Sequence, residues 1–131
     1  MKSYLFDFDG TLVDSMPTFV SVMTRILAEE GIKYPRDIIK IITPLGLSGT
    51  VKYFKEVLGL KFSDEKALKL MIEYMIEPYT NRVPAKDGVI ETLCEIKRRG
   101  HSLNVLTASP HETLDMCLKR LEIYDIFDNV W

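Results

Sequence analysis

Apolar and polar residues are arranged along the chain in a pattern that predicts short strands separated by helices. An apolar and aromatic run at residues 3–8 is typical of a strand buried on both faces, and it ends at an Asp-Gly pair. An alternating segment that becomes apolar predicts a second strand at 102–106, and residues 126–131 predict the start of a third. Apolar residues at helical spacing predict a helix over 89–99.

A further helix is predicted directly after the second strand. Ser109 and Glu112 have the S-x-x-E spacing of a capping box, and Pro110 falls at the first helical position. We therefore expect the Ser109 hydroxyl to cap a helix that runs through Leu121.

The segment between the first and second strands is predicted to be almost wholly helical. The expected helices cover residues 16–30, 37–42, 49–58 and 64–77. Ser63, which precedes two acidic residues, is expected to cap the last of these helices. Pro78 is expected to end it, because proline removes a backbone donor and its ring clashes with the preceding turn.

This order of elements predicts an α/β fold with a parallel sheet and right-handed crossovers. The helical block is then an insertion after the first strand. We expect residues 1–15 to form the first strand of a core and the loop that follows it, and residues 16–80 to form the helical insertion. Residues 81–131 are expected to belong to the core, with the second and third strands and their flanking helices.

Composition narrows the classes of protein that fit. With 131 residues, of which 47% are hydrophobic and 27% charged, the chain is about one domain long and can bury a substantial core. The formal net charge of −2 gives no indication of a nucleic-acid or membrane surface. No apolar run approaches the roughly 18 residues of a membrane span, and no signal-peptide pattern is present, so a cytoplasmic location is expected.

Two carboxylates, Asp7 and Asp9, directly follow the first predicted strand, and Thr107 follows the second. In open parallel sheets ligands bind beyond the carboxyl ends of the strands, and the helix after Thr107 would present N–H groups that favour an anion. Because two carboxylates repel an anion, a divalent cation is expected between the carboxylates and the anion. Mg²⁺ suits such a site because it prefers oxygen ligands. These residues indicate phosphoryl transfer, in which one carboxylate attacks phosphorus and the other handles the leaving-group proton.

The segment 7–15, DFDGTLVDS, resembles the first motif of the haloacid dehalogenase superfamily, in the phosphatase branch that carries a helical cap after this motif. Residues 105–109, VLTAS, resemble the second motif, and the Phe127-Asp128 pair matches a common marker before the third strand. The resemblance implies a Rossmann-like core with an inserted helical cap, as in phosphoglycolate phosphatases and β-phosphoglucomutases. The block 16–80 would then be a cap that closes over the site and selects the substrate.

The resemblance also implies roles for individual residues. Asp7 would be the nucleophile that forms an aspartyl-phosphate, and a Mg²⁺ ligand. Asp9 would be the general acid and base, with its backbone carbonyl on the metal. Thr107 and the Ala108 N–H would hold the phosphoryl oxygens. The expected substrate-binding residues are Gly10, Thr11, Thr107 and Ala108.

The sequence departs from the family pattern near its end. Such proteins usually carry a Lys or Arg after the third strand and an acidic pair on a fourth, and neither can be assigned before Trp131. The core is therefore expected to be incomplete at the C-terminus, so that a further segment or a second chain completes the sheet.

Two functions are compatible with these observations. The first is a Mg²⁺-dependent phosphohydrolase of small phosphorylated metabolites, of the phosphoglycolate or sugar-phosphate type, with a sugar-phosphate mutase as its near relative. The second is a truncated, non-catalytic protein that binds phosphate or a partner through an exposed sheet edge.

Overall fold

The computed structural model describes residues 1–131, which form two units. The sheet unit consists of residues 1–15 and 77–131, and the helical unit consists of residues 16–76. No helix in the chain combines the length and the apolar character that a membrane crossing requires.

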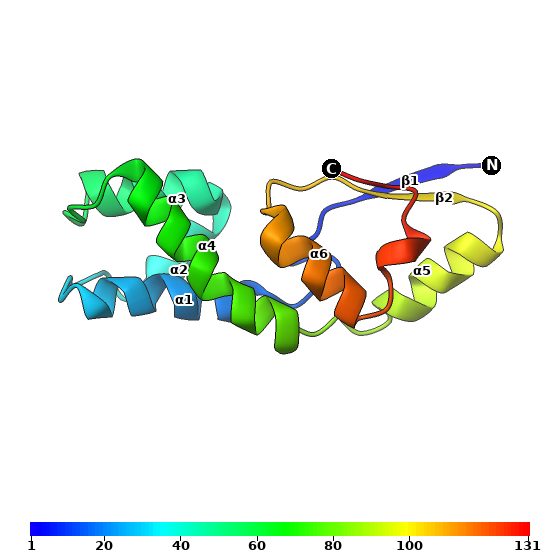
Figure 1. The fold of residues 1–131 in the computed structure, drawn as a ribbon, viewed down its shortest axis with the longest axis horizontal. Coiled ribbons are helices and arrows are strands. Elements are labelled where there is room, and N and C mark those ends of the chain that lie inside the picture. Colours follow the sequence, from blue (N-terminus) through cyan, green and yellow to red (C-terminus); the bar gives the residue numbers. More distant parts are fainter. The chain divides into compact units, whose positions relative to one another are not determined.

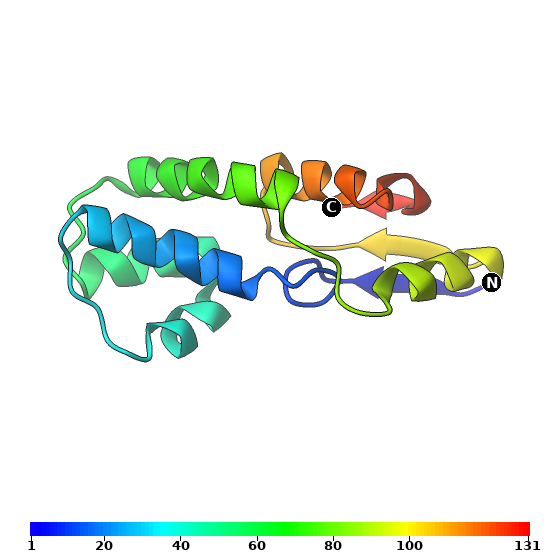
Figure 2. The ribbon, with the colours of Figure 1, turned by 90° about the horizontal axis from the view of Figure 1, so that it is seen from below.

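The sheet unit contains a three-stranded parallel sheet in the order β1-β2-β3 (Figure 1). Its strands are β1 (Ser3–Phe6), β2 (Ser102–Val105) and β3 (Asn129–Val130). Figures 1 and 2 show that α5 (Val89–Arg98) and α6 (His111–Arg120) lie on the same face of this sheet. A short 3₁₀ helix, η2 (Tyr124–Ile126), precedes β3. The predicted α/β class with a parallel sheet is confirmed.

The strand β1 is less buried than its apolar sequence predicts. It pairs with β2 along one edge only, and its residues alternate between exposed and half-buried, with Leu5 58% exposed. The prediction of a strand buried on both faces is therefore wrong. The physical reason is that β1 is an edge strand and that the two helices cover one face of the sheet, whereas the central strand β2 buries Leu103 and Val105 completely.

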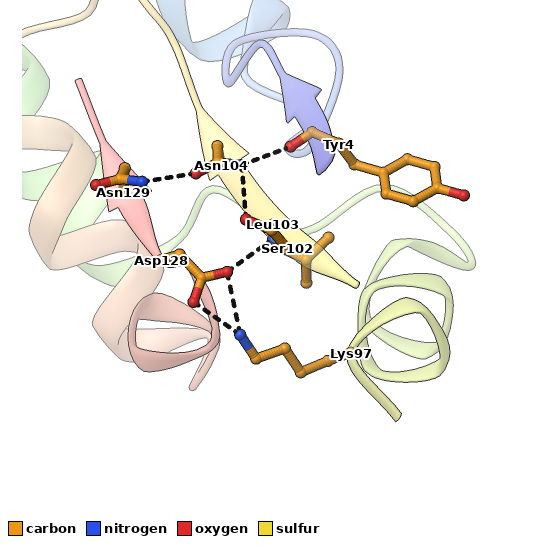
Figure 3. Close-up of polar contacts among 7 residues, drawn as sticks. All are labelled: Tyr4, Lys97, Ser102, Leu103, Asn104, Asp128 and Asn129. Atoms are coloured by element: carbon orange, nitrogen blue, oxygen red, sulfur yellow. Dashed lines mark hydrogen bonds and ion pairs between the residues drawn. The ribbon is translucent and has the colours of Figure 1, made fainter. Parts of the chain in front are cut away.

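Asp128 ties α5 to the sheet (Figure 3). Its carboxylate accepts the backbone N–H of Leu103 at 3.0 Å and the Lys97 ammonium group at 3.0 Å, and its own N–H donates to the Leu103 carbonyl at 2.7 Å. The Leu103 N–H and, after it, the Lys97 side chain favour the ionised carboxylate, and they hold the pKa of Asp128 below its ordinary value. Asp128, from the Phe127-Asp128 pair, thus has a structural role at the start of β3.

We expect Asp128→Asn to lower the thermal midpoint of unfolding by a few degrees at pH 7. Because the pKa of Asp128 is lowered in the folded state, its contribution is present above the pKa of the unfolded carboxyl and is lost as the pH falls through the folded pKa. The difference in thermal midpoint between Asp128→Asn and the parent should therefore become smaller as the pH falls below about 4. Circular dichroism melts across this range measure it, with Asp125→Asn as the control; a difference that does not depend on pH would contradict the assignment.

The helical unit is built from α1 (Met16–Glu29), α2 (Ile38–Ile42), η1 (Thr43–Leu45), α3 (Gly46–Glu56) and the first part of α4 (Asp64–Asn81). The helices expected in this segment are present, although α3 starts three residues earlier than expected, at Gly46 rather than Gly49. Side chains from all four α-helices form its buried core, among them Met23, Leu27, Ile42, Phe54, Met71 and Met75.

The helix α4 begins as predicted but ends later. The Ser63 hydroxyl accepts the N–H of Lys66 at 3.1 Å, which confirms Ser63 as the cap. Pro78 was expected to end the helix, but α4 continues through Pro78 to Asn81, so that prediction is wrong. The backbone continues the helix beyond Pro78, since the Arg82 N–H donates to the Pro78 carbonyl at 2.8 Å, and the Arg120 guanidinium group of α6 donates to the Tyr79 and Thr80 carbonyls of this last turn.

Candidate active site

The two predicted carboxylates lie on a tight loop after β1, and Phe8 anchors this loop. Phe8 is completely buried, and its carbonyl accepts the N–H groups of Thr11 at 3.2 Å and Leu12 at 3.0 Å. Gly10 has a positive φ of 74°, a conformation that glycine adopts without strain, and its N–H donates to the Val13 carbonyl at 3.0 Å. The D-F-D-G sequence therefore folds back on itself immediately after the strand.

Backbone hydrogen bonds also fix this loop to the segment that follows α4. The Asp14 N–H donates to the Pro84 carbonyl at 2.9 Å, and the Lys86 N–H donates to the Leu12 carbonyl at 3.0 Å. Such bonds restrict the loop before any ligand binds, which is the preorganisation that a catalytic site requires.

Asp7 is exposed and has few partners. One oxygen of its carboxylate, Oδ1, accepts the N–H of Phe8 at 2.7 Å, and no other side-chain hydrogen bond to Asp7 is formed. Its second oxygen therefore remains free to react with, or to bind, a group that approaches the loop.

Asp9 has the opposite environment, because three hydroxyl groups donate to its carboxylate. Ser15 Oγ donates to Oδ1 at 2.6 Å and Tyr79 OH donates to the same oxygen at 2.8 Å, while Ser109 Oγ donates to Oδ2. Ser15 and Tyr79 are completely buried. The position of the Asp9 side chain is therefore determined by donors from three different segments of the sheet unit.

The second predicted loop follows β2 and meets the first. Thr107 lies two residues after the end of β2, and its N–H donates to the Trp131 carbonyl at 3.0 Å. Its Oγ1 accepts the N–H of Ser109 at 3.1 Å, and Ser109 in turn contacts Asp9. The exposed Ala108 stands between them, and its N–H forms no hydrogen bond within the chain. The structure thus brings the two predicted motifs together at the carboxyl ends of β1 and β2.

Ser109 does not cap α6, contrary to the prediction from its S-x-x-E spacing. The helix begins at His111 with Pro110 as its cap residue, and no side chain provides a capping hydrogen bond. The Ser109 hydroxyl is directed instead to the Asp9 carboxylate, an acceptor that lies 100 residues away in sequence. A charged acceptor binds a hydroxyl more strongly than neutral groups do, so this contact replaces the local one.

Sequence reasoning also missed Ser15 and Tyr79. Ser15 is the last residue of the first motif, where a serine is commonly a helix cap, and nothing in the local sequence marks Tyr79. Burial, the Asp9 charge and the hydrogen bond to Asp9 together raise the pKa of Tyr79 far above its ordinary value. Tyr79 is therefore a permanent hydrogen-bond donor at physiological pH.

The residues of the first loop fit a cation that prefers oxygen ligands. The chain contains no group of three or more His, Cys, Asp and Glu side chains that could hold a metal ion by themselves. Mg²⁺, however, is commonly bound through one or two carboxylates, with water and substrate phosphate oxygens as its other ligands. The free oxygen of Asp7 and the backbone carbonyl of Asp9 are donors of this chemical type.

Relatives with related sequences are named as phosphatases. The chain is 26% identical over 128 residues to a phosphorylated carbohydrates phosphatase of Thermotoga maritima, and the match covers 98% of this chain and 59% of that protein. It is 30% identical over 132 residues to a phosphoglycolate phosphatase of Aquifex aeolicus, with the same coverage of 98% and 59%. The chain thus spans 59% of the length of each of these relatives.

Structural comparison and a family-wide sequence comparison agree with these matches. The fold is similar to the crystal structure of CbbY from Rhodobacter sphaeroides in complex with phosphate, with a TM-score of 0.84 and 18% identity over 99% of this chain and 62% of that one. A sequence model of the haloacid dehalogenase-like hydrolases matches residues 4–131. The chain therefore belongs to the haloacid dehalogenase-like hydrolase family.

Proposed function

We propose that this protein is a Mg²⁺-dependent phosphohydrolase that acts on small phosphorylated metabolites, of the phosphoglycolate or sugar-phosphate type, through an aspartyl-phosphate intermediate. The observation that carries the proposal is the contrast between two carboxylates on one loop. Asp7 is exposed and keeps one oxygen free, whereas Asp9 is held by three hydroxyl donors. The names of the Thermotoga and Aquifex relatives support the substrate class.

In the proposed reaction, a free oxygen of Asp7 attacks phosphorus while the bond from phosphorus to the leaving oxygen breaks. Asp9, protonated at this stage, gives its proton to the leaving alkoxide. The Asp9 carboxylate then takes a proton from a water molecule that attacks the aspartyl-phosphate. Inorganic phosphate is released, and Asp7 and Asp9 return to their starting states.

The remaining predicted residues would bind the phosphoryl group and the metal. We assign the Thr107 hydroxyl and the free N–H of Ala108 to the phosphoryl oxygens, and Gly10 and Thr11 to the floor of the substrate site. The Asp7 carboxylate and the Asp9 backbone carbonyl would hold Mg²⁺. When bound, the metal would offset the repulsion between the carboxylates and the phosphate ester.

We further propose that two parts of the chain have different functions. Residues 1–15 and 81–131 would form the catalytic core, and residues 16–80 the cap that selects the substrate and excludes water. A further segment or a second chain would pair with the edge of β1 that β2 leaves free.

Metal removal tests the proposed function directly. We expect EDTA to abolish hydrolysis of p-nitrophenyl phosphate and of phosphoglycolate, and Mg²⁺ to restore both, because the carboxylates repel an unscreened phosphate ester. Release of p-nitrophenolate and of inorganic phosphate measures the two reactions. Hydrolysis that persists in EDTA would contradict the metal requirement, and a protein that binds phosphate in calorimetry without hydrolysing any ester would be a binding protein instead.

A further inference from the structure

Tyr79 makes two contacts with the loop after β1 that carries Asp7 and Asp9. Its hydroxyl donates to Asp9 Oδ1 at 2.8 Å, across 70 residues of sequence. Its ring lies 6.3 Å from the ring of Phe8, centroid to centroid, and the two rings are tilted by 41°. Both side chains are completely buried, and Phe8 is the residue immediately before Asp9. Tyr79 therefore packs against the backbone anchor of the loop and binds its functional carboxylate.

Arg120 fixes the backbone at Tyr79 and at the residues that follow it. Its Nε donates to the Thr80 carbonyl at 2.7 Å, and its Nη2 donates to the carbonyls of Tyr79, at 3.3 Å, and Val83. The last carbonyls of a helix have no partner within the helix, so this guanidinium group satisfies acceptors that would otherwise need water. The end of α4 is thereby tied to α6 at the position of Tyr79.

The three donors to Asp9 differ in how firmly they are held. A serine hydroxyl can turn about one bond to another acceptor, and Ser109 lies in a loop. The Tyr79 hydroxyl is attached to a rigid ring, and the ring is fixed by packing against Phe8 and by the Arg120 contacts. Of the three donors, Tyr79 is the one whose side chain also packs against an aromatic ring and whose own carbonyl is bound by Arg120.

We propose that Tyr79 is a positioning residue, whose hydroxyl holds the Asp9 carboxyl in the orientation from which the leaving-group proton is transferred. This inference rests on the proposed function, because it assumes that Asp9 is the general acid. Tyr79 lies near the end of α4 and belongs to neither sequence motif. The Arg120 contacts would then also matter for the site, because they help to determine where the Tyr79 hydroxyl lies.

The test compares Tyr79→Phe with Tyr74→Phe. Tyr74 lies on the same helix and donates to a different carboxylate, that of Glu29, at 2.7 Å, so its variant removes an equivalent hydrogen bond away from Asp9. We expect Tyr79→Phe to lower kcat/KM for the alkyl ester phosphoglycolate about tenfold, the effect of losing one hydrogen bond of roughly 1.4 kcal/mol. For p-nitrophenyl phosphate, whose leaving group needs no proton, we expect a change of less than about threefold.

The ratio of the two kcat/KM values separates positioning from general damage, because lost folded protein would lower both in proportion. An unchanged ratio in Tyr79→Phe, or an equal change in Tyr74→Phe, would overturn the proposal. Crystal structures of the parent and of Tyr79→Phe provide a readout that does not require activity: we expect Asp9 to occupy a second rotamer in the variant. If the parent hydrolyses no phosphate ester, the proposed function fails. Independently of activity, an Asp9 rotamer that is the same in the parent and in Tyr79→Phe would overturn the positioning role.

Discussion

Asp7→Asn is expected to lower phosphatase activity by at least about 1,000-fold, because an amide oxygen is a much poorer nucleophile than a carboxylate. The side chain is exposed, and its one hydrogen bond, from the Phe8 N–H at 2.7 Å, can be made equally by an amide oxygen. The fold should therefore survive the substitution. The loss would then report on chemistry and not on stability.

Acid quenching after mixing with a ³²P-labelled phosphate ester measures the intermediate itself. The parent should retain label that hydroxylamine releases, as expected for an acyl phosphate, and Asp7→Asn should retain none. Asp14→Asn is the matched control, because Asp14 is an exposed aspartate on the same loop that is held through its backbone N–H. Labelled Asp7→Asn protein would show that another residue is the nucleophile.

The features that the sequence predicted correctly depend on neighbouring residues. The Asp-Gly pair after β1, the cap at Ser63 and the helix α5 each follow from residues a few positions apart. Parallel pairing of β1 with β2 follows from the order of elements. It places the loops after both strands at the same end of the sheet, where the strands have their carboxyl ends. The meeting of the two motifs was therefore predictable without knowledge of any side-chain contact.

The features that the sequence did not predict depend on contacts between distant segments. Pro78 is expected to end the helix, but here the Arg82 N–H donates to the Pro78 carbonyl and the Arg120 side chain, from α6, binds the carbonyls of the turn that follows. Ser109 has the spacing of a cap, but a carboxylate 100 residues away takes its hydroxyl. At Ser109 a local cap is worth about 1 kcal/mol, an amount that a single charge-assisted hydrogen bond can match.

The exposure of β1 has the same kind of cause. The sequence of this strand is apolar enough for a sheet interior, yet burial depends on which other elements cover it. Within these residues β1 has a neighbour on one edge only, and Leu5 is 58% exposed. The sequence of a strand therefore predicts the burial it can tolerate, while the rest of the sheet determines the burial it has.

Asp9→Asn is expected to slow hydrolysis of an alkyl phosphate by about 100- to 10,000-fold, the usual contribution of a general acid or base. The amide oxygen can still accept the hydroxyls of Ser15 and Tyr79, which lie 2.6 and 2.8 Å from Oδ1 of the parent. The fold around the site should therefore be kept. What is lost is the capacity to give a proton to the alkoxide and to take one from water.

The same variant should behave differently with p-nitrophenyl phosphate, and this difference identifies the role of Asp9. The p-nitrophenolate group leaves without a proton, so Asp7 should still be phosphorylated, whereas the attack of water lacks its base. Rapid mixing should then show one equivalent of p-nitrophenolate released in a burst, followed by slow turnover and by accumulation of ³²P-labelled protein. The parent should show faster turnover and less label. If Asp9→Asn turned over both esters as fast as the parent, Asp9 would have no part in proton transfer, and its three hydroxyl donors would serve only to hold the loop.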